Sequence, residues 1–464
     1  MVFSNLVFIF AFLPIVISLY YLIRKEFRNS VLLIASLFFY AWGEPTYLFL
    51  MIFSISTNYL LARVIIKTNK YRRIALIIAI IINIILLGYY KYAGFILSAI
   101  SGVFNFTYDF TPVALPIGIS FYTFQAIAYL VDIYRNEIKP QKNILDFALY
   151  ISFFPQLVAG PIVRYDIVAA QLKDRKESVN LFAQGCIRFI IGLGKKVLIA
   201  NQLGLVADEI FSSPHNELTT SLAWIGILAY TLQIYFDFSG YSDMAIGLGK
   251  MFGFKLPINF NYPYISKSIT EFWRRWHITL GSWFRDYIYI PLGGNRQGKW
   301  KYARNLFVVW FLTGLWHGAS WSFVIWGLYF GVIIALEKMA LSKVLIKLWA
   351  PLQHLYVLLI VMIGWVFFRA DNFVYSFHYL KIMFGINTPE YFDHTTVYYL
   401  HDYGVYFILG IIFSIPIKKM LSDNRIIFSQ KFQVIIPVVY IILFLLSIMY
   451  LTNSTYNPFI YFRF

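Results

Sequence analysis

Long apolar runs recur along the chain, and short polar segments separate them. A run of about 20 apolar residues crosses the hydrocarbon core as an α-helix, and the period-two alternation of a membrane barrel is absent. The pattern predicts an all-α polytopic membrane protein with about 11 transmembrane helices plus re-entrant and interfacial helices. Because no repeat or linker interrupts the pattern, residues 1–464 are expected to form a single transmembrane domain.

The charges of the first loops alternate along the chain. Residues 24–28 and 67–73 are rich in Lys and Arg, whereas residues 101–109 contain neither. Basic loops usually face the cytoplasm, so we expect an exterior N-terminus and five crossings before the basic segment near residue 140. The first run, residues 7–23, has no basic segment before it and is interpreted as a transmembrane helix, not a cleaved signal.

Three later segments differ from simple crossings. Residues 148–163 have basic residues beyond both ends and contain Pro and Gly, which favours a re-entrant segment enclosed by protein. Residues 252–304 are dense in Lys, Arg, Trp and Tyr, a composition typical of interfacial helices on the cytoplasmic face. The runs 306–315 and 321–336 also have basic residues beyond both outer ends and therefore predict a hairpin with its turn at membrane depth.

The remaining runs complete the predicted topology. Residues 181–205 contain Lys195 and Lys196 in their middle, where two lysines are expected to face an interior cavity and not lipid. By the same charge rule, the outward crossings are 181–205, 355–368 and 434–450, the inward crossings are 222–247 and 403–416, and the exterior segments are 370–402 and the C-terminal tail 451–464.

Composition agrees with a membrane protein and excludes several other classes. The chain has 464 residues, of which 60% are hydrophobic and 13% charged, against roughly a quarter charged in a soluble domain. The net charge of +17 is spread over short clusters between apolar runs, which indicates contact with membrane lipid and argues against nucleic acid as a partner. The single cysteine, Cys186, excludes an internal disulfide, and no Cys/His cluster predicts a metal site.

His317 is the main candidate for a catalytic residue. It lies between two apolar runs, with Gly314 and Gly318 beside it and Trp316 and Trp321 as flanking residues that could line a pocket. An imidazole at membrane depth needs a partner or a function, and its ordinary pKa near 6.5 suits a general base at neutral pH. The alternative, a structural histidine satisfied by its surroundings, remains open.

His277 lies in the basic and aromatic segment that is predicted to be interfacial. Its neighbours Arg274, Arg275 and Arg285 are candidates for binding a phosphate-bearing cytosolic donor, because guanidinium groups pair with phosphate in a bidentate manner. The alternative is an ordinary interfacial histidine.

A polar patch lies at the end of the run 222–247. It includes Asp237 and Asp243, for which we favour a structural or pocket-shaping role. The sequence contains no Gly-x-Ser-x-Gly elbow, no His-Glu-x-x-His motif and no P-loop. Ser322 stands five residues after His317, so the His-x-x-x-x-Asp arrangement of soluble acyltransferases does not apply either.

Several blocks in order along the chain resemble one family. They are LPIGISFYTFQ (115–125), FPQLVAGPI (154–162), DFSGYSD (237–243), NFNYP (259–263), FWRRWH (272–277) and WHG (316–318). With these blocks the sequence resembles the membrane-bound O-acyltransferase (MBOAT) family. Within it, the resemblance is to the bacterial branch that includes the membrane subunits of alginate and peptidoglycan O-acetylation and the teichoic-acid D-alanylation protein.

The resemblance implies an MBOAT fold in which a cytoplasmic and an exterior funnel meet at His317. His277 matches the second histidine of the family, whose role is less settled. The resemblance also implies a multi-pass protein of the bacterial cytoplasmic (inner) membrane. The charge alternation, independently of the resemblance, places both termini on the exterior side. Similar chains end in an aromatic motif like residues 459–464, in which Tyr461 would carry the acyl group. The alternative for Tyr461 is an anchor at the level of the lipid headgroups.

The function expected from the resemblance is O-acetyl transfer. Acetyl-CoA would be the cytosolic acyl donor, with no bound cofactor, and an extracytoplasmic partner transferase would pass the group to a polysaccharide such as peptidoglycan or alginate. Three alternatives stay open: D-alanyl transfer to teichoic acid, a non-catalytic transporter or flippase of a cell-envelope intermediate, and a scaffold for an exterior transferase.

Overall fold

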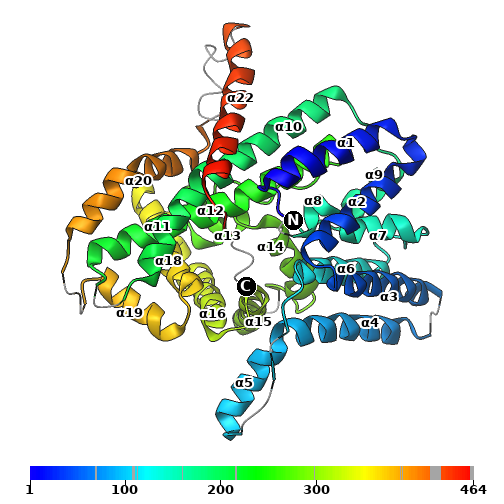
Figure 1. The fold of residues 1–464 in the computed structure, drawn as a ribbon. Helices are drawn as coiled ribbons and strands as arrows, with labels where there is room; N and C mark the ends of the chain where they lie inside the picture. The colour runs from blue at the N-terminus through cyan, green and yellow to red at the C-terminus, as the bar shows by residue number, and fades with distance from the viewer. Residues whose placement is uncertain are drawn as a thin grey trace. The chain divides into compact units, whose positions relative to one another are not determined.

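The chain folds into helices, which Figure 1 shows. They form two compact units. The computed structural model describes residues 1–67, 70–106, 110–111, 113–158, 160–214, 217–296, 298–386, 388, 390–417 and 430–459. Within these ranges the regular structure is helical and contains no strand, which confirms the all-α prediction. The first unit comprises Met1–Phe189 and Met244–Pro257, and the second comprises Ile190–Asp243 and Ile258–Phe464.

The first unit contains the N-terminal helices. They are η1 (Phe8–Phe12), α1 (Leu13–Leu22), η2 (Lys25–Phe27), α2 (Arg28–Gly43), α3 (Tyr47–Lys67), α4 (Arg72–Leu87), η3 (Gly88–Tyr92), α5 (Ala93–Phe104), α6 (Ile119–Tyr134), α7 (Ile144–Ser152), α8 (Phe154–Leu157) and α9 (Tyr165–Lys173). Two further helices, α10 (Val179–Gly194) and α12 (Thr220–Met251), contribute residues to both units.

The second unit contains the remaining helices, including those around both candidate histidines. They are η4 (Lys195–Ala200), α11 (Asn201–Ser212), η5 (Pro263–Ile265), α13 (Ile269–Arg275), α14 (Ile278–Phe284), η6 (Arg285–Tyr289), α15 (Lys299–His317), α16 (Trp321–Leu336), η7 (Glu337–Leu341), α17 (Ser342–Leu345), α18 (Ala350–Arg369), α19 (Phe373–Met383), α20 (His394–Phe413) and α22 (Gln430–Asn453).

Long apolar helices confirm a multi-pass membrane protein. Among the described residues, eight helices are long and apolar enough to cross a membrane: Tyr47–Lys67, Arg72–Phe104, Val179–Ser212, Thr220–Met251, Trp321–Leu345, Ala350–Arg369, His394–Phe413 and Ile435–Asn453. The predicted first crossing corresponds to the shorter apolar helix Phe8–Leu22. The total of about 11 crossings and the sidedness of the loops stay predictions.

The predicted re-entrant segment is broken into two short helices. α7 ends at Ser152 and α8 begins at Phe154, whose backbone N–H donates to the Ser36 hydroxyl at 3.1 Å. The Gln156 side chain donates to the carbonyl of Tyr150. Other protein groups therefore satisfy polar groups at the break, as a non-helical segment inside a membrane would require. Its depth in the membrane stays a prediction.

One helix boundary predicted from hydropathy is wrong. The inward crossing was expected at residues 403–416, but α20 already begins at His394, so residues 394–402 are helical and not part of a loop. Asp393 caps this helix by accepting the backbone N–H of Thr396 at 2.9 Å. The first turns of α20 contain polar residues, so hydropathy did not indicate where the helix begins. The capping residue marks its start. The segment expected to be exterior, residues 370–402, also contains α19.

The two lysines in the middle of Val179–Ser212 lie where the helix widens into the π turn η4. Lys195 pairs with Asp243 and Lys196 pairs with Asp237, each at 2.7 Å. The Lys196 and Asp237 side chains are both 2% exposed. The polar patch of α12 therefore serves as the counter-charge for lysines that would otherwise be buried alone, in line with the structural role expected for the two aspartates.

Candidate active site

His317 is the last residue of α15, at the turn of a hairpin with α16. The two helices lie side by side in Figure 1. Their backbones approach closely because Gly314 faces Phe323, where a Cβ on residue 314 would overlap the Phe323 carbonyl oxygen. Gly318 is likewise pressed against the Phe323 ring. The predicted hairpin is confirmed, and the depth of its turn in the membrane stays a prediction.

Aromatic rings enclose the His317 imidazole on several sides. The rings of Trp316, Trp326 and Phe368 are all edge-on to it, with centroid distances of 5.0, 4.9 and 5.2 Å. His317 itself is only 4% exposed. Trp321, which was expected to line a pocket, is 59% exposed. The tryptophan of α16 that packs against the imidazole is Trp326.

A left-handed turn between α13 and α14 holds His277. Its backbone has φ +45°, a conformation that is uncommon for non-glycine residues. Asn259 fixes the turn: its carbonyl accepts the N–H of Ile278 at 2.9 Å, and its side-chain oxygen accepts the N–H and hydroxyl of Thr279 at 3.1 and 2.9 Å. The NFNYP block thus positions the histidine of the FWRRWH block.

Burial sets the protonation state of His277. The residue is 3% exposed, and this desolvation lowers its pKa from 6.5 to about 3. At neutral pH the imidazole is therefore uncharged and a weak base, because a general base works best with a pKa near the working pH. A neutral His277 is suited to hydrogen bonding with a substrate and does not act as a cation for phosphate.

One pocket of about 550 Å³ brings both histidines together. Residues from α13, α14, η6, α15 and α16 line it, and most of them are apolar or aromatic. The lining residues are Thr270, Trp273, Arg274, Trp276, His277, Ile278, Leu280, Gly281, Ser282, Phe284, Arg285, Tyr289, Leu306, Val309, Trp310, Thr313, His317 and Ile334. The predicted interfacial segment and the predicted hairpin thus build a single site.

Two of the three candidate arginines line this pocket. Arg274 is exposed, and Arg285, whose side chain is 61% exposed, forms a bidentate pair with Asp286 at 2.6 and 3.0 Å. Arg275 is not among the lining residues. Its guanidinium pairs instead with Glu271 at 2.9 Å and donates to the Asn261 carbonyl at 3.1 Å. The pocket therefore joins a buried imidazole pair to two exposed guanidinium groups.

Comparison with known proteins identifies the family. Residues 135–377 match the membrane-bound O-acyltransferase family, MBOAT. The protein named probable alginate O-acetylase AlgI of Azotobacter vinelandii is 39% identical over the whole of both chains, and that of Pseudomonas aeruginosa is 45% identical over 84% of this chain and 76% of its own. The peptidoglycan O-acetyltransferase of Helicobacter pylori is 40% identical over 83% of this chain and 80% of its own.

The chain belongs to the MBOAT family. It is accordingly an O-acyltransferase. For this chemistry an MBOAT protein needs a base, a way to hold an acyl donor and a route for the acceptor. The pocket is lined by the predicted base, His317, and by Arg274 and Arg285, two of the arginines predicted to bind the donor. The individual roles of these residues stay predictions.

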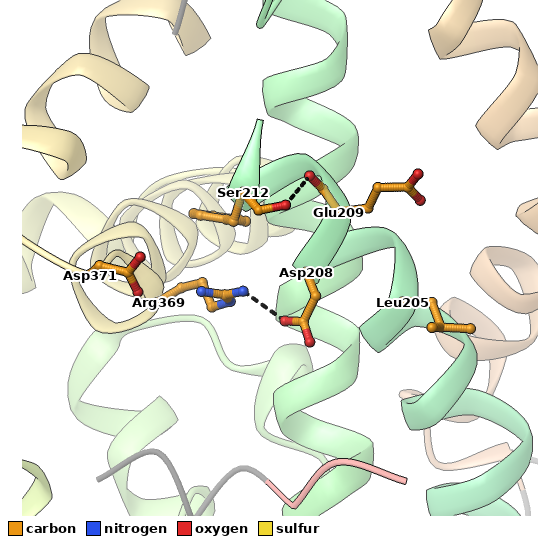
Figure 2. A pocket seen from close by; sticks show the side chains of 7 residues that line it. Leu205, Asp208, Glu209, Ser212, Arg369 and Asp371 are labelled. Carbon is orange, nitrogen blue, oxygen red and sulfur yellow. Dashed lines mark hydrogen bonds and ion pairs between the residues drawn. The ribbon is translucent and has the colours of Figure 1, made fainter. Parts of the chain in front are cut away.

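A second pocket of about 480 Å³ lies at the ends of α11 and α18. Figure 2 shows Arg369 of α18 pointing at Asp208 of α11, with an ion-pair distance of 2.7 Å. The other oxygen of Asp208 accepts the hydroxyl of Tyr456, from the C-terminal tail, at 2.6 Å. Tyr461, the predicted acyl carrier, lies outside the described residues, but the described part of the tail ends only two residues before it.

Sequence reasoning missed Glu337, which anchors the helix before His277. Its buried carboxylate accepts the N–H groups of Ile269 and Thr270 at 2.6 and 2.8 Å, at the N-terminus of α13. The negative charge also suits the positive end of the helix dipole. The available signal was a single Glu after the run 321–336, but its partner lies far away in the sequence. No pattern in the chain links the two.

Proposed function

We propose that this MBOAT protein takes an acetyl group from cytosolic acetyl-CoA across the bacterial inner membrane for O-acetylation of an extracytoplasmic polysaccharide. The pocket that contains His277, His317, Arg274 and Arg285 carries the proposal. Exposed guanidinium groups at such a pocket fit the phosphates of coenzyme A, and its apolar walls fit the pantetheine arm. The buried end of the pocket then presents the thioester to His317.

The reaction begins with the Tyr461 hydroxyl as acceptor. His317 removes the phenolic proton, the phenolate oxygen attacks the thioester carbonyl, and a carbon–oxygen bond replaces the carbon–sulfur bond. The protonated imidazole returns its proton to the coenzyme A thiolate, so that atoms and charge balance. Base assistance matters because a phenol with a pKa near 10 contains little phenolate at neutral pH. An extracytoplasmic partner transferase then passes the acetyl group to a sugar hydroxyl.

The position of the C-terminal tail supports this direction of transfer. Charge alternation predicts that the ends of residues 181–205 and 355–368, and the tail, all lie on the exterior side. Asp208, Arg369 and Tyr456 belong to these three segments or directly follow them, and they contact one another. The contact agrees with a common side for all three, and it favours a C-terminus that folds back toward the protein from the exterior.

The names of the relatives support the acceptor class. The proteins of A. vinelandii and P. aeruginosa are named for alginate, and that of H. pylori is named for peptidoglycan. Both are polysaccharides outside the cytoplasm. A membrane enzyme that carries acyl groups outward, and not the donor itself, would serve either polymer.

The test uses purified protein in liposomes with acetyl-CoA that carries a radiolabelled acetyl group. We expect label on the C-terminal peptide that contains Tyr461 and release of free coenzyme A. Tyr461→Phe keeps the ring and removes the nucleophile, so it should lose the label. Label that persists in this variant would contradict the tyrosyl ester. Translocation of a substrate without thioester cleavage would instead favour a transporter. In cells, the envelope polymer that loses acetate in a deletion strain identifies the acceptor.

A further inference from the structure

The last described residues of the tail follow a defined path along the second unit. Tyr456 donates to Asp208 at 2.6 Å, and Asn457 accepts from Asn201 at 3.3 Å. The carbonyl of Pro458 accepts a hydrogen bond from the Lys196 ammonium. As the tail advances by one residue at a time, its partners move back along α11 into η4, so the tail runs antiparallel to this helix.

The inner end of the path is buried. Phe459 is 6% exposed, and its ring packs against Tyr241 of α12 with centroids 4.6 Å apart. Tyr241 lies in the same DFSGYSD block as Asp237, the partner of Lys196. The tail therefore contacts α12 as well as η4 and α11.

Lys196 is the charged group at the centre of this path. Its ammonium has three N–H donors, of which one faces Asp237 and another the Pro458 carbonyl. A buried ion pair stabilises a fold poorly compared with apolar residues, because desolvation offsets the attraction. A fold that only needed to join two helices at this depth would be better served by apolar packing. The second contact, to the tail, gives the pair a purpose beyond joining helices.

Both lysines lie in the π turn η4. In a regular α-helix, consecutive residues point about 100° apart. Within η4, the neighbours Lys195 and Lys196 both reach aspartates of the same helix, α12. Lys196 contacts the described part of the tail, and its side chain is 2% exposed against 23% for Lys195. π turns are found often at functional sites.

We propose that Lys196 is a positioning residue for acyl transfer. Asp237 holds the Lys196 ammonium, which in turn fixes the carbonyl of Pro458. The acceptor hydroxyl belongs to the residue three positions further on, so the backbone of that residue can lie at most roughly 10 Å from this fixed point. This inference rests on the proposed function, in which Tyr461 accepts the acetyl group. Lys196 itself does not touch the reacting atoms. Its role is to favour the tail hydroxyl over water as the acceptor of the acetyl group.

The test compares two products in the same assay. Radiolabelled acetyl-CoA is supplied to the full-length protein in liposomes, and label on the C-terminal peptide is measured together with total release of coenzyme A. Lys196→Met keeps the length of the side chain and removes the ammonium. We expect at least a 10-fold fall in the ratio of peptide label to coenzyme A released, with release itself continuing and its KM unchanged. An unchanged ratio would overturn the proposal.

Lys195→Met is the matched control, because it removes the neighbouring lysine and its ion pair with Asp243. Its ratio should stay near that of the wild type, and an equal fall in both variants would assign the effect to general loss of buried charge. The double variant Lys196→Asp with Asp237→Lys restores the ion pair but moves the ammonium to α12. The ratio of peptide label to coenzyme A released should stay low in this double variant. Full recovery of the ratio would show that Lys196 has only a structural role.

A chemistry-independent readout separates this inference from the proposed function. In a Cys186→Ser background, Asn201→Cys and Asn457→Cys are joined by a short thiol-specific cross-linker. Lys196→Met should slow this cross-linking by several-fold, and Lys195→Met should not. If the wild type never acquires label on Tyr461 but the cross-link still depends on Lys196, the tyrosyl ester is wrong while the placement of the tail stands. Cross-linking that ignores Lys196 overturns the placement.

Discussion

Trp316 stands edge-on to His277, with ring centroids 6.0 Å apart and ring planes at 82°. The same indole is 5.0 Å from His317, its neighbour in the sequence. One buried tryptophan thus contacts the imidazoles of both the hairpin and the α13–α14 turn. The two histidines belong to one enclosure. Desolvation keeps His277 neutral at pH 7, and His317 stays the predicted base.

Replacement of His317 by Ala should abolish acetyl transfer. Loss of a general base lowers rates by about 100- to 10,000-fold, while the aromatic enclosure should keep the hairpin folded. Ester-linked acetate on the acceptor polymer and label transfer in liposomes provide the measurement, with the amount of membrane-inserted protein determined in parallel. His401, which is exposed and pairs with Asp402, is the control, and His401→Ala should behave as wild type. Retained acetylation in His317→Ala would rule out the catalytic assignment.

The arginines of the pocket should affect donor binding in different degrees. Arg274→Ala and Arg285→Ala should each raise the KM for acetyl-CoA by about 5- to 10-fold, as expected for loss of a charge-assisted contact of about 1 kcal/mol or more. Arg275→Ala should change the KM less, because that guanidinium is engaged by Glu271 and lines no part of the pocket.

A phosphate-free thioester provides the control for this prediction. With S-acetyl-N-acetylcysteamine as donor, all three arginine variants should match the wild type. An equal rise in KM for both donors would show that the arginines maintain the pocket and do not bind phosphate.

The rings around His317 should restrict the length of the acyl group. Phe368 lies 5.2 Å from the imidazole, centroid to centroid, and is buried. Phe368→Leu opens space beside the reacting carbonyl, so the ratio of kcat/KM for butyryl-CoA to that for acetyl-CoA should rise about 10-fold, the usual scale for one or two methylenes in an apolar pocket. Initial rates with the two donors measure the ratio. A ratio that does not move would place the acyl chain elsewhere.

The stability of the protein should depend on pH through His277. Its folded-state pKa is about 3, and the unfolded value is near 6.5, so the unfolded chain binds more protons between these values. The free energy of unfolding therefore holds above pH 6.5 and falls as the pH decreases from 6.5 toward 3. Thermal unfolding in detergent from pH 8 to pH 4 measures this. His277→Gln should flatten the dependence, and a variant with the full slope would assign the slope to other groups.

Sequence reasoning worked best where local signals decide the structure. The hairpin with His317 at its turn could be predicted because two apolar runs, their flanking charges and the Gly residues are all contiguous. The union of this hairpin with the FWRRWH segment came from the resemblance and not from any spacing, since pockets form from residues that are distant in the sequence. Trp321 shows the limit of adjacency: it is next to the turn but exposed, while Trp326 packs on the histidine.

Long-range pairing explains most of what could not be predicted. Arg275 pairs with Glu271, four residues before it in the helix. This spacing could have indicated the pair, and so have distinguished Arg275 from Arg274. The pairing of Lys196 with Asp237, by contrast, depends on how two helices pack and on a widened turn that hydropathy does not record. The sequence indicated that both charges needed partners. It did not indicate that they would find each other.

The π turn at Lys195–Ala200 also sets the rotational phase of everything that follows it in the helix. If the same residues wound as a regular α-helix, α11 would be rotated by about 100° relative to α10. Asn201 and Asp208 would then face away from the tail, although every side chain that contacts it would still be present. The alignment of the tail thus depends on the number of residues per turn at this one point of the helix.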